Sequence, residues 1–368
     1  MNASLTPPSP DLLASLLAIP SLSGQEGEAT AFLSAWMAAH GFDASFVDAA
    51  GNAVGLRDGG AGPGGAPPRD IVLLGHIDTV PGEIAVRVED GKLFGRGAVD
   101  AKGPLAAFAA AVAQVQPAPG WRLIVIGAVE EEAATSKGAR FAAGQYHPAL
   151  CIIGEPSGWE RVTLGYKGRL LADVAVRQPM AHTAGPDAGV CEIAVAVWNR
   201  VQAQIETINA GRERAWQQVL PSIRTMASGS DGLTEWATLR LGFRLPEDLG
   251  PTDLQALIVA AAGAADVHFS GAEPAFRAEK NSPLARAFLA AIRSQGGRPG
   301  FLLKTGTSDM NVVGPAWGCP ILAYGPGDSS LDHTPHEHVQ VAEWQRGVAV
   351  LRGALAQVMT GIGVSLND

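Results

Sequence analysis

Residues 70–82 read DIVLLGHIDTVPG, and this stretch decides the fold class. Its apolar run from Ile71 to Leu74 is typical of a strand buried on both faces, as in a parallel sheet. Two later stretches, WRLIVIGAVEEE (121–132) and ALCIIGEPS (149–157), have the same design of an apolar strand that ends in an acidic residue. Helical stretches lie between them. Alternating strands and helices predict an α/β fold with a doubly wound, mostly parallel sheet.

The pattern changes near Leu164, where strands with alternating polarity and two long helices begin. This segment predicts a smaller α+β domain over residues 164–271. From Pro283 the α/β pattern returns, so the smaller domain is predicted to be an insertion. We therefore expect a larger domain made of residues 1–163 and 272–368.

The composition excludes several classes of protein. The chain has 368 residues, of which 47% are hydrophobic, so a largely disordered protein is excluded. Its net charge of −9 and the lack of a basic stripe argue against nucleic-acid binding. Three separate cysteines indicate a reducing cytoplasm, and we expect neither a signal peptide nor a membrane span.

Chemically reactive side chains follow the predicted strands. Ligands of such sheets bind at the carboxyl ends of the strands, and His76, Asp78 and Glu155 fall at such ends. His76 alone could equally be a buried histidine that bonds to a loop. Asp100, which follows a glycine-rich turn, would taken alone more often be a helix N-cap.

Two further clusters join this pattern. Three consecutive carboxylates, Glu130 to Glu132, would repel one another at a strand end unless a cation or solvent surrounds them. The segment LDHTPHEHV (331–339) contributes His333, His336 and His338, which could also be surface histidines. Together, histidines and carboxylates suit Zn²⁺, Co²⁺ or Mn²⁺, and this carboxylate-rich set suits a pair of metals bridged by one aspartate.

In this order, the motifs GHIDTVPG, GRGAVDAKGP, EEE, IIGEPS, TSDMN and GPGDSSLDHTPHEHV resemble those of the M20 family of di-zinc amidohydrolases and peptidases. The resemblance spans nearly the whole chain. It implies a catalytic domain, an inserted lid through which such enzymes often dimerise, and two divalent metals, with Zn²⁺ favoured over Co²⁺.

The resemblance also implies a role for each residue at the metals. His76 would bind the first metal, Asp100 would bridge both, and Glu155 and His333 would complete the first and second sites, whereas His336 and His338 would bind none. Asp78 would orient His76. Glu131 would be the general base and Glu132 a ligand, although Glu130 stands where the family has aspartate and a shift of one position remains open. The peptide bond between Asp100 and Ala101 would be cis.

Two residues of the insertion match substrate-binding residues of the family. His182, in PMAHTAGP, would contact the substrate carbonyl, and Arg244, in GFRLP, would bind a substrate carboxylate with its planar fork. The family aspartate two positions before this arginine is Gly242 here. Without the resemblance, His182 would be read as a loop histidine and Arg244 as a surface arginine.

Within the family, GRGAVDAKGP, IIGEPSGWE, TLGYKGRL and LKTGTSDMN are most similar to the branch that releases lysine, and in some organisms ornithine, from the carrier protein LysW in lysine and arginine biosynthesis. The chain would then be a cytoplasmic homodimer with LysW as its partner. Alternatives are a small-molecule deacylase, such as acetylornithine deacetylase or succinyl-diaminopimelate desuccinylase, a dipeptidase, and an inactive binding module.

Overall fold

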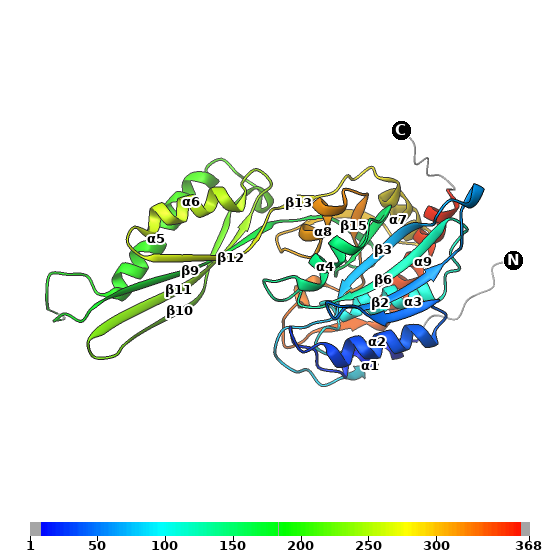
Figure 1. The fold of residues 1–368 in the computed structure, drawn as a ribbon, viewed down its shortest axis with the longest axis horizontal. Helices are drawn as coiled ribbons and strands as arrows, with labels where there is room; N and C mark the ends of the chain where they lie inside the picture. Colours follow the sequence, from blue (N-terminus) through cyan, green and yellow to red (C-terminus); the bar gives the residue numbers. More distant parts are fainter. Residues whose placement is uncertain (1–8, 183, 362–368) are drawn as a thin grey trace. The chain divides into compact units, whose positions relative to one another are not determined.

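The computed structural model describes residues 9–182 and 184–361, and the chain divides into two compact units (Figure 1). Each unit has its own hydrophobic core. The smaller unit comprises Tyr166–Arg277 and Leu303–Thr307. The larger unit comprises the chain before Tyr166, the segment Ala278–Leu302, and the chain from Ser308 onward. The segment Leu303–Thr307 was expected in the larger domain. Its long-range contacts, such as the bond from the Lys167 amide to the Lys304 carbonyl, group it with the smaller unit.

The larger unit is built on a twisted sheet. Its strands are β1 (Ala44–Val47), β2 (Ala53–Asp58), β3 (Arg69–His76), β6 (Trp121–Ala128), β7 (Leu150–Gly154), β8 (Arg161–Tyr166) and β15 (Ile321–Ala323), in the order β1-β2-β6-β3-β7-β15-β8. The four central strands β6, β3, β7 and β15 run parallel, while β2 and β8 are antiparallel to their inner neighbours. The α/β class with a mostly parallel sheet is therefore confirmed.

Helices cover this sheet. They are α1 (Asp11–Leu17), α2 (Gly27–Ala39), α3 (Lys102–Ala113), α4 (Lys137–Gln145), α7 (Pro283–Ser294), α8 (Met310–Trp317) and α9 (Val341–Thr360). Helix α3 packs on β3, β6 and β7, and α9 packs on α3 and α7. A side chain at Gly154 would come within 2.9 Å of Phe108 on α3, so glycine in β7 permits this close approach. All residues of α3 from Lys102 to Val112 are buried, which gives the loop before it a rigid support.

A small antiparallel sheet lies in the same unit. It consists of β4 (Arg87–Glu89), β5 (Lys92–Phe94) and β16 (His338–Gln340), in the order β16-β5-β4. Short 3₁₀ helices occur at Pro63–Gly65 and Ser329–Leu331 in this unit, and at Ala215–Gln217 in the smaller unit. The pairing of His338 with Phe94 brings the histidine-rich segment beside the chain that leads into α3.

The smaller unit is an antiparallel sheet with two helices on one face. Its strands are β9 (Gly168–Pro179), β10 (Leu220–Ser230), β11 (Thr234–Leu245) and β12 (Asp266–Glu273), in the order β10-β11-β9-β12, and its helices are α5 (Val190–Asn209) and α6 (Pro251–Ala262). Strand β10 was not predicted. It is an edge strand whose residues are mostly exposed, so its sequence carries no apolar alternation. Two further short strands, β13 (Phe276–Arg277) and β14 (Gly300–Lys304), belong to the same sheet as β8 and not to this four-stranded sheet.

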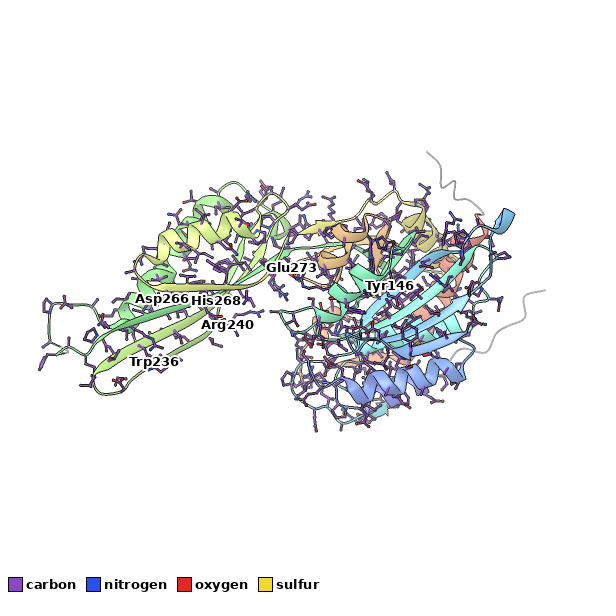
Figure 2. The ribbon with its side chains drawn as sticks, viewed as in Figure 1. Tyr146, Trp236, Arg240, Asp266, His268 and Glu273 are labelled. Atoms are coloured by element: carbon purple, nitrogen blue, oxygen red, sulfur yellow. The ribbon has the colours of Figure 1, made fainter. Side chains whose placement is uncertain are left out.

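The two faces of this sheet differ in polarity. Residues of β9 and β11 that face the helices are apolar and buried, including Val174 and Leu241. The alternate positions carry polar side chains, among them Arg240, which pairs with Asp173 at 2.9 Å, and His268 on β12 (Figure 2). Within the described residues, no helix is both long and apolar enough to cross a membrane.

Candidate metal centre

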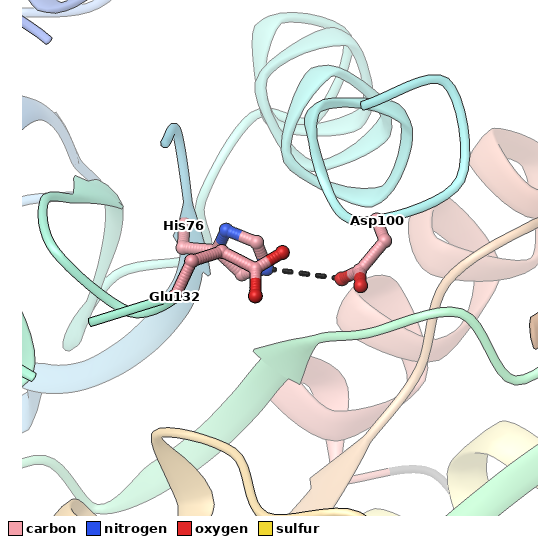
Figure 3. Close-up of side chains that lie close together, drawn as sticks. All are labelled: His76, Asp100 and Glu132. Atoms are coloured by element: carbon pink, nitrogen blue, oxygen red, sulfur yellow. Dashed lines mark hydrogen bonds and ion pairs between the residues drawn. The ribbon is translucent and has the colours of Figure 1, made fainter. Parts of the chain in front are cut away.

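A cluster of possible metal ligands lies where β3 and β6 end. His76 is the last residue of β3, Asp100 lies just before α3, and Glu132 follows β6 (Figure 3). One ligand atom from each of the three lies within 4.8 Å of the others. Parallel strands end at the same sheet edge, which explains how residues so distant in sequence meet.

Asp100 faces two histidines at once. Its Oδ1 lies 3.2 Å from His76 Nε2, and its Oδ2 lies 2.9 Å from His333 Nε2. The same His333 nitrogen lies 2.9 Å from Glu132 Oε1. Asp100 is not the N-cap of α3, because Ala101 holds that position, and the peptide bond between the two residues is cis as expected. One carboxylate with an oxygen toward each histidine is the arrangement that a bridging ligand requires.

The ring of His76 is held in one orientation by the residue two positions later. Its Nδ1 lies 3.0 Å from the carbonyl oxygen of Asp78 and 3.4 Å from the carboxylate Oδ1 of the same residue. Because a carbonyl oxygen only accepts hydrogen bonds, Nδ1 donates and Nε2 presents its lone pair in the neutral ring. Nε2 is therefore the atom of His76 that is available to a metal.

The Asp78 carboxylate organises the acidic loop. Its two oxygens accept the backbone N–H groups of Glu131 and Glu132, both at 3.0 Å, and the hydroxyl of Ser23 at 2.7 Å. Burial works to raise the pKa of Asp78, but hydrogen bonds, foremost with His76, lower it below its ordinary value. Ser23 was missed by the sequence analysis because nothing in its local pattern indicates a partner so far along the chain.

The three consecutive glutamates have different environments. The Glu130 carboxylate accepts a bond from Thr135 and pairs with Lys137. Glu131 Oε2 lies 3.9 Å from His76 Nε2. Glu132 contacts His333, so Glu131 and Glu132 line the cluster while the Glu130 side chain bonds elsewhere.

Buried negative charge dominates the electrostatics of the cluster. Burial raises the pKa of Glu131 well above its usual value, and the nearby carboxylates of Glu155 and Asp309 add to this rise against the attraction of His76. Hydrogen bonds with Asp100 and Glu132 raise the pKa of His333 to about 10. Carboxylates and imidazoles that lie together in this way form the donor set that divalent metals take once the imidazoles have released their protons.

Comparison with known proteins gives the family. The sequence model of peptidase family M20/M25/M40 matches residues 72–357. The chain belongs to this family. An M20 family metallo-carboxypeptidase from Sulfolobus solfataricus shares the fold, with a TM-score of 0.76 at 16% identity over 95% of this chain and 98% of the other.

Two curated relatives are similar along most of their length. A [LysW]-lysine hydrolase from Deinococcus radiodurans is 48% identical over 359 residues, which cover 95% of this chain and 97% of the relative. A [LysW]-lysine/[LysW]-ornithine hydrolase from Sulfurisphaera tokodaii is 30% identical over 280 residues, 74% of this chain and 77% of the relative. The M20 family is metal-dependent, and the donor set described above fits such metals.

The remaining predicted residues lie at different places in the fold. Glu155, buried after β7, acts on Glu131 through its charge. His338 bonds through Nδ1 to the carbonyl of His336 and packs its ring on Phe94. His182 and Arg244 belong to the smaller unit. The exposed His182 accepts a hydrogen bond from the Ala184 N–H, and Arg244 donates one to the Thr307 hydroxyl.

Proposed function

We propose that this M20 protein is a two-metal amide hydrolase that releases lysine, and ornithine as a second product, from the carrier protein LysW. The observation that carries this proposal is the 48% identity, over nearly the full length of both chains, with a [LysW]-lysine hydrolase. The clustering of His76, Asp100, Glu132 and His333 supports catalysis and argues against an inactive binding module.

The proposed ligands divide between two metals. His76 and Glu155 would hold the first, Glu132 and His333 the second, and Asp100 both, with Zn²⁺ as the favoured ion and Co²⁺ as an alternative. Bound metals would lower the pKa of a water molecule and polarise the amide carbonyl of the substrate. Asp78 contributes by fixing the ring of His76 and the backbone of Glu131 and Glu132.

Glu131 is the proposed general base. The Glu131 carboxylate lines the cluster, with Oε2 3.9 Å from His76 Nε2, and it is not one of the proposed metal ligands. It would accept a proton from the attacking water and later donate it to the leaving amine, a task for which a raised pKa is suited.

The proposed substrate bond is the amide between the side-chain carboxyl of the carrier's terminal glutamate and the α-amine of lysine. Hydrolysis adds one water, so that the carrier regains its carboxylate and the lysine leaves with a free amine. His182 and Arg244 are proposed to bind the substrate carbonyl and carboxylate, which rests on the resemblance of their motifs. We further propose that the protein is a cytoplasmic homodimer whose subunits associate through the smaller unit.

Turnover of defined substrates tests this function. The metal-loaded protein is incubated with LysW-linked lysine, LysW-linked ornithine, acetylornithine and succinyl-diaminopimelate, and the released amino acid is quantified. We expect release from LysW with the highest kcat/KM, and loss of release after chelation. Faster turnover of acetylornithine or the succinyl compound would favour a small-molecule deacylase, and no turnover with metals bound would favour a binding module.

A further inference from the structure

Glu337 is a buried glutamate to which the function described so far assigns no role. It lies four residues after His333, between two histidines, in a segment whose composition predicts a polar loop. Its side chain is nevertheless completely buried. A carboxylate in such a position requires partners, because burying an unpaired charge is costly.

The partners of Glu337 belong to the loop that carries Asp100. Its Oε1 accepts the backbone N–H of Val99 at 2.9 Å and the N–H of Asp100 itself at 3.1 Å. Its Oε2 lies 2.7 Å from a terminal nitrogen of Arg96. The glutamate thus holds the backbone of the residue whose side chain faces both histidines.

Arg96 extends this contact to the other side of the cluster. The same terminal nitrogen donates to the carbonyl of Thr334, the neighbour of His333, at 3.2 Å, and Nε donates to the carbonyl of Gly82 at 2.9 Å. The Arg96 side chain is also largely buried, so its bonds to Glu337 and Thr334 are partly shielded from water, whereas its bond to Gly82 is exposed. The pair joins two chain segments that each supply a residue to the cluster.

We propose that Glu337, held by Arg96, is a positioning residue that sets the placement of Asp100 relative to His333. This inference rests on the proposed metal centre. A bridging carboxylate must present both oxygens to their partners simultaneously, so a small displacement of its backbone disturbs both sites. The Asp78 carboxylate holds the loop of Glu131 and Glu132 in the same manner, by accepting consecutive backbone N–H groups.

Replacing Glu337 by glutamine isolates this role. The amide oxygen can still accept the bonds from Val99 and Asp100, but its NH₂ group then faces the donors of Arg96. The pair can no longer join the two segments. Partners that orient metal ligands typically contribute about 10–100-fold to metal affinity.

The test measures metal binding rather than activity alone. Metal-free wild type and Glu337→Gln are titrated with Zn²⁺ against a chromophoric chelator, and with Co²⁺ while visible absorption is recorded. We expect Glu337→Gln to bind about 10–100-fold more weakly, with an altered Co²⁺ spectrum. We also expect kcat to fall more than KM rises.

A matched control removes a similar ion pair elsewhere. Asp70 pairs with Arg122 through two bonds of 2.8 Å, at the start of β3 and therefore at the strand end opposite His76. Asp70→Asn makes the same change from carboxylate to amide. We expect it to lower stability without changing the Zn²⁺ affinity or the Co²⁺ spectrum.

The outcomes separate the two proposals. Metal binding by Glu337→Gln with wild-type affinity and spectrum would overturn the positioning role alone, whereas a wild type that binds no metal would overturn the proposed function as well. If Glu337→Gln does not fold, Arg96→Lys replaces it, since lysine keeps the charge but cannot reach Glu337, Thr334 and Gly82 together. Wild-type Zn²⁺ affinity in Arg96→Lys would likewise refute the role.

Discussion

The three glutamates after β6 differ in their neighbours, and single substitutions should separate their roles. We expect Glu131→Gln to retain metal, because Glu132, Asp100 and the histidines are unchanged. Its turnover should fall by roughly 10²–10⁴, the usual contribution of general acid–base catalysis. Metal content by atomic emission and turnover by amino-acid release, measured on one preparation, check this.

The two glutamates that flank Glu131 provide the controls for this prediction. Glu132→Gln removes an oxygen that contacts His333, so its metal content should fall. Glu130→Asp should keep both metal and turnover, because that side chain bonds to Thr135 and Lys137. Loss of metal in Glu131→Gln, together with loss of turnover but not metal in Glu130→Gln, would shift the assignment by one residue.

Lys167, a buried lysine of the smaller unit, should make stability depend on alkaline pH. It donates to the carbonyls of Ala215, Trp216 and Gln218, and burial lowers its pKa to about 8 from the 10.5 of a free lysine. Between these values the folded chain has released a proton that the unfolded chain still binds. The contribution of Lys167 to the free energy of unfolding should therefore rise with pH from about 8 to 10.5.

The measurement compares wild type with Lys167→Met in urea. The difference between their unfolding midpoints should be constant below pH 8 and should then shift in favour of the wild type as the pH rises. A difference that is independent of pH up to 10 would show that Lys167 keeps its proton in the folded protein.

At the scale of the element, the start of α3 tolerates no side chain at its second residue. A Cβ at Gly103 would lie 2.1 Å from the carbonyl oxygen of Ala98, in the loop that leads to Asp100. Gly103→Ala must therefore displace backbone, and overpacking of this kind typically costs about 1–3 kcal/mol or more. We expect a lower unfolding temperature and weaker metal binding.

Gly144 in α4 is the matched control for the same substitution. A Cβ at Gly144 would meet no atom within 4 Å. Gly144→Ala should stabilise the protein by up to about 0.5–1 kcal/mol, because alanine favours the helix. Differential scanning calorimetry of both variants checks the opposite signs, and equal shifts would contradict the packing argument.

The sequence predicted those features that depend on the local pattern of a single element. The apolar runs predicted β3, β6 and β7 and placed His76 and Glu132 after strands whose ends meet, whereas Asp100 and His333 were assigned through the motifs that resemble the M20 family. Glu337 was not found, because its partners Val99 and Asp100 lie more than 230 positions away and its own surroundings are polar. Strand β10 was missed for a similar reason, since its exposed edge carries no periodic signal.

On the scale of the whole molecule, metal binding should stabilise the two units unequally. The cluster belongs to the larger unit, and the smaller unit has a separate core. A ligand at about 100 times its Kd stabilises the part it binds by about 2.7 kcal/mol. Hydrogen exchange with and without Zn²⁺ should therefore show added protection in β3, β6 and α3 and none in α5 and β11. Equal protection throughout would contradict independent cores.

Because the smaller unit is inserted in the larger one, a ribosome completes nearly all of the smaller unit before it completes the larger unit. When the chain has been made as far as Arg277, the smaller unit lacks only Leu303–Thr307, whereas the larger unit still lacks α7, β15, α9 and His333. Helix α9 packs on α3, and Trp344 is fully buried in the core, so that core stays open until synthesis is nearly finished. During translation, the nascent chain should therefore fold its smaller unit first and acquire a metal centre only in its last stage.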